Sequence, residues 1–344
     1  MAIIYIDGFD VYPDVSATSY GVQSEWQILY VAFASNGVGT GRFGGQSIYA
    51  STSDAGSCGY GKVVASPTSG MSVGFSFQWT MSFANLSGRS SMMTAYNGTT
   101  DVWGVGLNGL GQLYIWTAAG GGYTTPLVTY GTPLSAGAWN HIEAVGTIGA
   151  SATITVYLNG ASVLTYTGNT GSGTCSLIKL GYVADGSWAA TWYWDDFFFT
   201  NTAAQVGERR VQTLVPSANS TVAWTPLSGS NYANVNELPV NGDTSYVYAS
   251  TAGTQDLYTT AGLSGTATAI SCVQMRTCAR KDDSATRQIA TVLSSTGTVQ
   301  VGATQNLTAG YLYYLDLYAT DPHTSAAWTQ AGVNAALIGQ KVIS

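Results

Sequence analysis

Charged side chains are scarce in this chain of 344 residues, because Lys, Arg, Asp and Glu together make up 8% of it, against about 25% in ordinary globular proteins. The eleven Lys and Arg residues are scattered along the sequence, and the net charge is −7. No basic stripe is present that could neutralise phosphates. We therefore expect no nucleic-acid partner.

Long hydrophobic runs are also missing. The first six residues are apolar, but Asp7 follows them and no basic residue precedes them, so the features of a signal peptide are lacking. No stretch approaches the roughly 20 apolar residues that a membrane span needs. The sequence predicts synthesis in a host cytoplasm, without a signal peptide and without a membrane span.

Cysteine and histidine are scarce, and their spacing matches neither a zinc site nor a dense disulfide framework. Of the four cysteines, Cys272 and Cys278 fall in one expected strand, where six residues span about 20 Å, too far for a disulfide. The two histidines, His141 and His323, show no zinc-ligand spacing. No Gly-x-Ser-x-Gly motif accompanies them, so we expect His141 to be a packing residue.

Glycine and aromatic residues are abundant instead, with 42 Gly, 22 Tyr and 10 Trp. Aromatic residues favour strands, and glycine favours turns. The clearest hairpin is Thr153–Leu158, then Asn159-Gly160, then Ala161–Tyr166, and its first arm alternates apolar and polar residues. Many short strands with Gly-rich turns predict an all-β sandwich or jelly roll with little helix.

The strand pattern breaks after Phe199, near the charged run Glu208-Arg209-Arg210. We therefore expect two domains, residues 1–205 and a smaller β domain, residues 206–344. The expected strands are Ile3–Ile6, Ser72–Phe83, Val102–Leu107, Leu113–Trp116, His141–Val145, Leu177–Tyr182, Val211–Val215, Thr244–Ala249, Ala269–Ala279, Gln288–Leu293 and Leu312–Tyr318. A short helix capped by Thr329 is expected near the C-terminus.

Three short motifs in the first domain resemble a known family. They are Trp139-Asn-His-Ile-Glu143, Val156-Tyr-Leu-Asn-Gly160 and Trp194-Asp-Asp-Phe-Phe198. Together they resemble the concanavalin A-like lectin/laminin-G jelly roll over roughly residues 1–200. The resemblance implies a concanavalin A-like jelly-roll sandwich for the first domain, followed by a smaller β-sandwich domain.

The second domain resembles a module of tailed-bacteriophage virion proteins. The motifs are Gly207–Pro216, Trp224-Thr-Pro226, Asn231-Tyr232, Asn236-Glu237, Asp243–Val247, Arg280–Asp283, Asp321-Pro322 and Ala327-Trp-Thr329. The resemblance implies a virion structural protein displayed on the particle surface, as a capsid decoration, head fibre or tail-associated component. Its partners would be other virion proteins. Low charge and many aromatics add the expectation of a homo-oligomer, such as a trimer.

Aromatic residues near Gly-rich segments are the candidate carbohydrate-binding residues. They are Tyr96, Trp103, Tyr123 and Trp188, with Asn97 and Asp185 as hydrogen-bonding groups. The same aromatic residues could belong to the core or to a subunit interface, where aromatics are enriched. The alternative function is therefore an adhesin, a lectin module that holds a host-surface glycan without cleaving it. For that function the fold is only an analogy.

Glycoside hydrolysis requires two carboxylates about 5–10 Å apart. The Glu-x-Asp-x-x-Glu pattern of some concanavalin A-like glucanases is absent, and Glu25, Glu143, Glu208 and Glu237 are widely separated in the sequence. On this ground the sequence predicts that the chain is not an enzyme, with a glycoside hydrolase as the least favoured alternative.

Four aspartates could form a calcium site. Asp7 and Asp10 follow the first strand, and Asp195 and Asp196 lie in the last strand of the first domain. First and last strands of a jelly roll often lie side by side, and calcium binds clustered carboxylate oxygens. The alternative is that these carboxylates cap turns or accept backbone N–H bonds. No other cofactor is expected.

Overall fold

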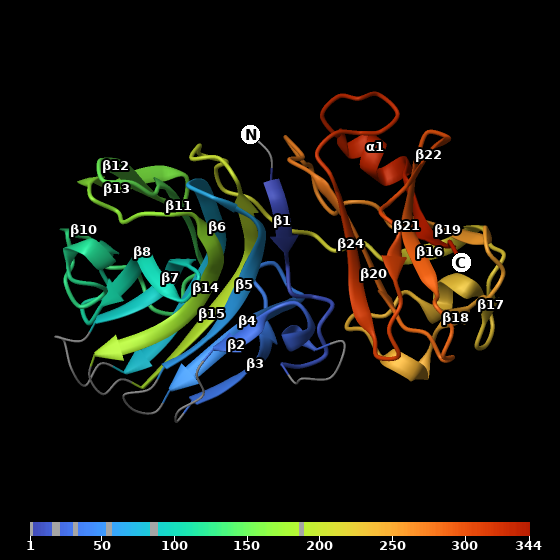
Figure 1. The fold of residues 1–344 in the computed structure, drawn as a ribbon, viewed down its shortest axis with the longest axis horizontal. Helices are drawn as coiled ribbons and strands as arrows, with labels where there is room; N and C mark the ends of the chain where they lie inside the picture. The colour runs from blue at the N-terminus through green and yellow to red at the C-terminus, as the bar shows by residue number, and fades with distance from the viewer. Residues whose placement is uncertain (1–2, 16–20, 30–33, 53–56, 83–88, 186–188) are drawn as a thin grey trace. The chain divides into compact units, whose positions relative to one another are not determined.

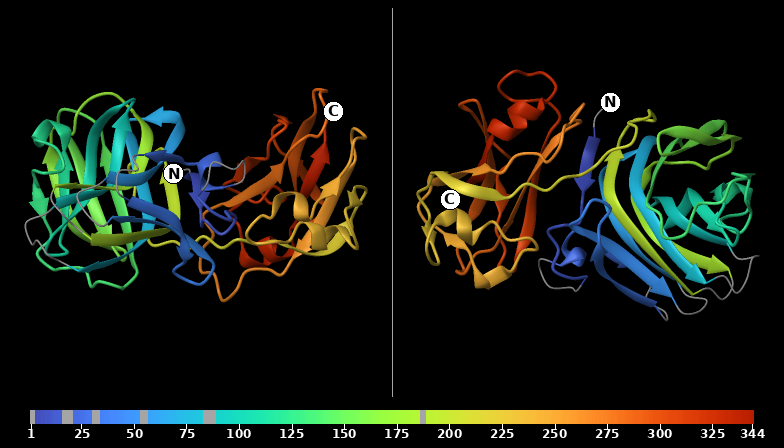
Figure 2. Two further views of the ribbon diagram at one scale, coloured as in Figure 1. Left: turned by 90° about the horizontal axis from the view of Figure 1, so that it is seen from below. Right: turned by 180° about the vertical axis from the view of Figure 1, so that it is seen from behind.

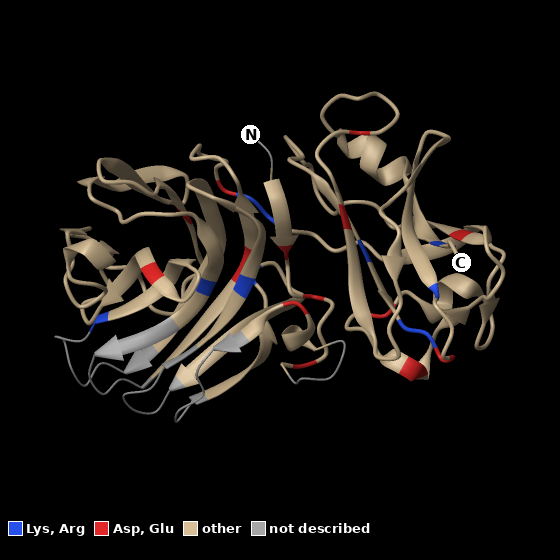
Figure 3. Cartoon of the chain, viewed as in Figure 1, with Lys and Arg blue, Asp and Glu red and all other residues tan. Residues whose placement is uncertain are grey.

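The computed structural model describes residues 3–15, 21–29, 34–52, 57–82, 89–185 and 189–344 (Figure 1). The chain is 50% strand and 6% helix, far below the roughly one-third helix of an average globular protein, which confirms the predicted all-β fold. Charged residues are sparse throughout (Figure 3). Among the described helices, none has the length and apolar character that a membrane crossing requires.

Two compact units make up the chain. Unit 1 contains Met1–Phe9 and Glu25–Val211, and unit 2 contains Asp10–Ser24 and Gln212–Ser344. The boundary after Val211 lies close to the predicted break, but the assignment of an N-terminal segment to unit 2 was not expected from the sequence.

Unit 1 is a jelly-roll sandwich of two antiparallel sheets (Figures 1 and 2). The eight-stranded sheet has the order β13-β12-β11-β6-β15-β4-β3, with β1 also paired to β15, and the seven-stranded sheet has the order β10-β9-β8-β7-β14-β5-β2. Their bounds are β1 Ile3–Asp7, β2 Gln27–Leu29, β3 Ala34–Thr40, β4 Gln46–Thr52, β5 Ser57–Thr68, β6 Gly70–Ser82, β7 Arg89–Asn97, β8 Thr100–Asn108, β9 Leu113–Thr117, β10 Val128–Thr129, β11 Asn140–Thr147, β12 Ala152–Leu158, β13 Ala161–Gly168, β14 Cys175–Asp185 and β15 Ala189–Thr200.

The core of unit 1 lies between the two sheets. Tyr60 of β5 sets the inward direction, because its hydroxyl donates to the carbonyl of Tyr49 in the facing sheet at 2.8 Å. Leu180 lies opposite Tyr60, and Met93 lies opposite Leu180, so all three side chains face inward, and all are fully buried. Side chains one residue along each strand face outward, because the side-chain period of a strand is two.

Two sequence predictions for unit 1 are confirmed. The hairpin of β12 and β13 turns at Asn159 and Gly160 with φ values of 50° and 83°, as a two-residue turn requires. Strand β1 pairs with β15. Asn36-Gly37 is not a turn but lies within β3, where a Cβ on Gly37 would approach the Tyr49 ring to 2.5 Å, so the glycine makes room for that ring.

Unit 2 contains a six-stranded sheet in the order β16-β19-β25-β21-β22, with β23 paired to β21, and the two-stranded sheets β17-β18 and β20-β24. The bounds are β16 Pro216–Thr221, β17 Thr225–Pro226, β18 Val247–Tyr248, β19 Gln255–Thr260, β20 Val273–Ala279, β21 Gln288–Ser295, β22 Thr298–Val301, β23 Gln305–Asn306, β24 Leu312–Tyr318 and β25 Leu337–Val342. Helix α1, Gln330–Ala335, begins as predicted, because the Thr329 side chain accepts from the Gly332 N–H at 3.0 Å.

Two strands predicted near the start of unit 2 differ in the structure. Residues 211–215 form no strand, because the Val211 N–H donates to the Asp196 carboxylate at 2.8 Å rather than to a neighbouring strand. In the predicted strand Thr244–Ala249, only Val247 and Tyr248 pair, and Thr244 ends a short 3₁₀ helix.

The segment Asp10–Ser24 is bound to the rest of unit 2 by polar and aromatic contacts. The Val11 carbonyl accepts from the Val240 N–H at 3.0 Å and from the Tyr313 hydroxyl at 3.2 Å. The Arg276 guanidinium donates to the Tyr12 hydroxyl at 3.2 Å, and the rings of Tyr12 and Tyr313 lie 5.5 Å apart. The chain therefore leaves unit 1 after β1, contributes to unit 2, and returns.

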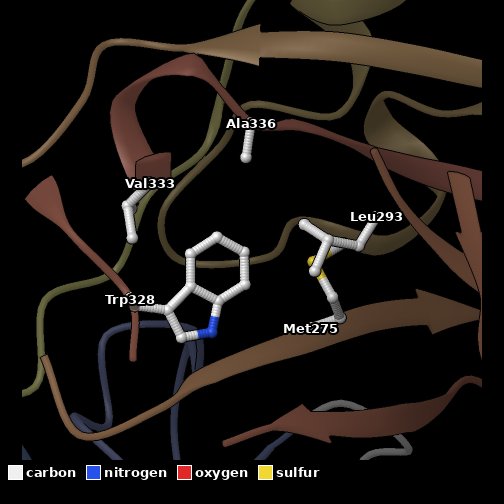
Figure 4. Close-up of a cluster of buried hydrophobic side chains, with 5 residues drawn as sticks. All are labelled: Met275, Leu293, Trp328, Val333 and Ala336. Atoms are coloured by element: carbon white, nitrogen blue, oxygen red, sulfur yellow. The ribbon is translucent and has the colours of Figure 1, made fainter. Parts of the chain in front are cut away.

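The hydrophobic cluster of unit 2 supports a stability prediction. It consists of Met275, Leu293, Trp328, Val333 and Ala336 (Figure 4). Val333→Ala should lower the free energy of unfolding by about 1–2 kcal/mol, because lost transfer energy and a small cavity outweigh the better helix propensity of alanine.

Urea denaturation measures this change. The control is Val299→Ala in β22, where the side chain is 48% exposed and the substitution should have little effect. Equal effects of the two substitutions would contradict the assigned cluster.

Candidate functional site

One cross-strand row on the outer face of the seven-stranded sheet combines a cation, a hydroxyl and an aromatic ring. In register across β5, β14, β7, β8 and β9, the row consists of Gly61, Lys179, Thr94, Gly104 and Trp116. Residues directly opposite one another share a face of the sheet. The row lies one residue from the inward-facing row of Tyr60, and therefore faces away from the core. We call it the polar row.

Aromatic rings from β9 lie across glycines of β8. A Cβ on Gly104 would lie 2.7 Å from Cζ2 of Trp116, and a Cβ on Gly106 would lie 2.2 Å from Cζ of Tyr114. Both glycines are therefore needed for the rings to lie close to the sheet. The Trp116 Nε1–H donates to the Ser91 hydroxyl at 3.3 Å, which ties the indole to β7.

The segment of residues 118–127 packs above these rings. The Tyr114 hydroxyl donates to the Tyr123 carbonyl at 2.9 Å, and the Tyr123 ring meets Trp116 edge-on, with centroids 6.4 Å apart. The Arg89 guanidinium donates to the Thr124 carbonyl at 2.5 Å. These contacts hold the segment over the part of the outer face that carries Tyr114 and Trp116.

Polar groups of this face are shielded from bulk water although they point away from the core. Lys179 is 2% exposed and Thr94 is 4% exposed, and the hydroxyls of Ser91 and Thr94 lie 2.8 Å apart. The next row, Tyr96, Leu177 and Val63, is more open, since Val63 is 54% exposed. Solvent therefore reaches the face beside a fixed set of hydroxyl, ammonium and aromatic groups.

Three of the predicted carbohydrate-binding residues lie on or beside this face. Tyr96 is half-buried in the open row, Tyr123 is half-buried above Trp116, and Asn97 is exposed at the β7–β8 turn. The Asn97 side-chain amide donates to the Ser172 carbonyl at 3.4 Å. This end of the sheet therefore brings Tyr96, Asn97 and Tyr123 together with the polar row.

The other three predicted residues do not join them. Trp103 is not in a loop but in β8, where it is fully buried in the core, and its ring occupies the space beside Gly146 of the facing sheet. Asp185 ends β14, and its side chain lies outside the described part of the structure, as does all of Trp188.

Sequence inspection did not single out Lys179, Thr94 or Trp116. One signal was available, because Lys179 interrupts the apolar strand Leu177-Ile178-Lys179-Leu180. A charge inside an apolar strand marks a position that points away from the core or is paired.

Asp7 accepts hydrogen bonds from neighbouring side chains and backbone. Its donors include the Tyr5 hydroxyl at 2.7 Å, the Phe9 N–H at 3.0 Å and the Trp26 Nε1–H at 3.0 Å. Asp10 belongs to unit 2. In the described ranges, no group of three or more His, Cys, Asp or Glu side chains has a metal-binding arrangement.

Asp195 and Asp196 also accept bonds from the protein. Asp195 accepts from the N–H groups of Arg42 and Asp196 at 2.8 and 2.7 Å. Asp196 accepts from the Ser76 hydroxyl at 2.7 Å and the Val211 N–H at 2.8 Å, and burial raises the pKa of this carboxyl. The bonds from backbone N–H groups are of the kind expected if these carboxylates cap turns instead of binding calcium. Calcium binding stays a prediction. A shift in the midpoint of thermal unfolding between added calcium and a chelator would test it.

On the outer face of the eight-stranded sheet, two buried side chains hold residues 206–211, which we call the strap. Glu143 accepts from the N–H groups of Val206 and Gly207 at 2.6 and 2.8 Å. The Arg209 N–H points to His141 Nε2 at 3.5 Å, and the imidazole stacks on Phe198. Burial lowers the pKa of His141 to about 4, so this histidine is neutral and contributes to packing.

No protein-family model and no curated protein matches the sequence. Similar solved structures include a sialidase, with a TM-score of 0.46 and 12% identity over 58% of this chain and 18% of that one. An endo-β-1,4-glucuronan lyase from the fungus Trichoderma reesei has a TM-score of 0.41 and 11% identity, over 61% and 100% of the two chains. Alginate lyase Aly36B has a TM-score of 0.40 and 10% identity, over 60% and 98%.

These comparisons correct one prediction. The sequence analysis predicted that the chain is not an enzyme, but the similar solved structures include sialidases and glucuronan and alginate lyases by name, and the prediction does not stand. Its physical weakness is that the absence of one hydrolase motif excludes one mechanism, whereas a single fold supports many chemistries. What unit 1 shares with these carbohydrate-processing proteins is the jelly-roll sandwich.

Proposed function

We propose that unit 1 binds a glycan on the outer face of its seven-stranded sheet. The observation that carries this proposal is the solvent-accessible row of Tyr96, Leu177 and Val63, which lies beside the buried polar row. Sugars present apolar ring faces and hydroxyl groups together. The half-buried rings of Tyr96 and Tyr123 fit the ring faces, and the exposed side-chain amide of Asn97 fits the sugar hydroxyls.

The fixed geometry supports binding, because groups held in place before the ligand arrives lose little conformational entropy on association. The rings of Tyr114 and Trp116 lie across Gly106 and Gly104, and the Trp116 indole is hydrogen-bonded to Ser91. Tyr96 is the half-buried aromatic of the open row, so it is the ring that a sugar would meet first.

A glycan array followed by titration calorimetry tests the proposal. Tyr96→Ala should weaken binding of the selected glycan at least tenfold, because stacking of a sugar ring on the aromatic ring is lost. The matched control is Tyr166→Ala in β13 of the other sheet, also half-buried, which should leave affinity unchanged. No saturable binding, or equal loss in both variants, would refute the proposal. Released sugar, measured in the same samples, reports any cleavage.

We further propose that the chain is a structural protein on the surface of a bacteriophage particle, as a capsid decoration, head fibre or tail-associated component. The support is the resemblance of residues 206–344 to virion proteins and the sparse charge of the chain. In this role other virion proteins are the partners of unit 2, copies assemble as a homo-oligomer such as a trimer, and unit 1 contacts host-surface glycans. Mass spectrometry and electron microscopy of purified particles should find the protein there, and its absence would overturn this proposal.

A further inference from the structure

The open row of Tyr96, Leu177 and Val63 continues onto β8 at Asp101, which lies directly opposite Tyr96. Residues in that position have Cβ atoms about 5 Å apart and share a face of the sheet, so the carboxylate lies beside the Tyr96 ring. Asp101 is half-buried. Within the described part of the chain, its side chain forms no hydrogen bond or ion pair. The row therefore combines an aromatic ring with a carboxylate that a ligand can reach.

The backbone that carries Asp101 is held in place by the turn between β7 and β8. The Gly98 N–H donates to the Ser176 hydroxyl at 2.8 Å, and the Asn97 side-chain amide donates to the Ser172 carbonyl at 3.4 Å. The carboxylate is thus positioned beside Tyr96 before a ligand arrives, which reduces the entropy lost on binding.

The cations of this face are not presented by the open row. Lys179 lies in the neighbouring polar row, where it is 2% exposed and has contacts within the protein. Arg89 lies at the other end of β7 from Tyr96, with its guanidinium bound to the Thr124 carbonyl. The charge that the open row presents is therefore negative. In a chain of net charge −7, an acidic ligand would be repelled both at this row and by the chain as a whole.

We propose that the glycan bound by unit 1 is neutral, and that Asp101 selects it. This inference rests on the proposed glycan-binding function. An ionised carboxylate accepts hydrogen bonds at two oxygens and donates none, so Asp101 fits two adjacent hydroxyl groups of a sugar ring that stacks on Tyr96. Such bonds are stronger than those between neutral groups. An acidic sugar would instead bring a second negative charge to the same row.

The test uses gluco-, manno- and galacto-oligosaccharides, each paired with the uronic-acid oligosaccharide of the same configuration. We expect the intact protein to bind the neutral member of a pair about tenfold more tightly than the acidic member, because of the like charge at Asp101. The difference should shrink as sodium chloride is raised, because salt screens the repulsion. A uronic-acid oligosaccharide bound as tightly as its neutral partner would overturn the inference and leave the proposed function standing. Binding of no glycan would refute both.

Variants assign the preference to a residue. Asp101→Asn removes the charge at nearly the same size, so it should weaken binding of the neutral glycan, strengthen binding of the acidic one and remove most of the preference. The matched control is Asp282→Asn in unit 2, which removes the same charge from an exposed side chain and should leave the preference unchanged. If Asp101→Asn kept the full preference, Asp101 would not be the residue that selects the glycan.

Discussion

Replacing Glu143 with alanine is expected to lower the free energy of unfolding of unit 1 by about 4 kcal/mol. The side chain is fully buried and accepts from the Ser72 hydroxyl at 2.5 Å as well as from the N–H groups of Val206 and Gly207. Removing the carboxylate leaves buried donors without an acceptor, and each costs about 1–3 kcal/mol. The strap would then lose its attachment at residues 206 and 207.

Urea denaturation, followed by tryptophan fluorescence, measures the loss. Glu208→Ala is the control, because Glu208 also belongs to the strap and pairs with Arg42, but its side chain is 41% exposed. Exposed ion pairs contribute about 0–1 kcal/mol. If the two variants were equally stable, the hydrogen bonds of Glu143 would not be what holds the strap.

Acidification is expected to remove about 3 kcal/mol of stability through His141 alone. Burial lowers its pKa from 6.5 to about 4 in the folded state, and each pKa unit corresponds to about 1.4 kcal/mol. The unfolded state therefore binds a proton at a pH where the folded state does not. The contribution of His141 to the free energy of unfolding is fully present above pH 6.5. It decreases as the pH drops and is lost below about pH 4.

His141→Gln isolates this contribution, because glutamine does not titrate and can still accept the Arg209 N–H. The free energy of unfolding of both proteins is measured from pH 8 to pH 4, and the difference between them should change by about 3 kcal/mol. Asp196 acts in the opposite direction, since its raised pKa favours folding as it becomes protonated, but it is present in both proteins. Parallel curves would show that His141 is not buried in its neutral form.

Local patterns predicted the elements of unit 1 well. The alternation of Thr153–Leu158 and the Asn159-Gly160 turn define their hairpin without help from distant residues. The polar row could not be predicted in this way, because Lys179, Thr94 and Trp116 become neighbours only through the register of four strands. A glycine next to an aromatic residue in the sequence can mark a turn, or it can make room for a ring from a neighbouring strand. Gly104 follows Trp103 not because the chain turns there, but because the Trp116 ring crosses it.

The segment Asp10–Ser24 could not be predicted because its position depends on side chains more than 200 residues away, such as Arg276 and Tyr313. Nothing in its own sequence separates it from unit 1. In unit 2, short strands such as Val247–Tyr248 are stabilised by tertiary contacts rather than by a long alternating pattern, which explains why the predicted strand there was too long.

The path of that segment means that three stretches of backbone join the units, at residues 9–10, 24–25 and 211–212. A protease that cut only at residues 211–212 would sever the one covalent link to residues 212–344, but the segment Asp10–Ser24 would still hold them through the non-covalent contacts of Val11 and Tyr12. A tensile load applied between unit 1 and residues 212–344 would likewise be shared between the backbone at residues 211–212 and the non-covalent contacts of the segment Asp10–Ser24.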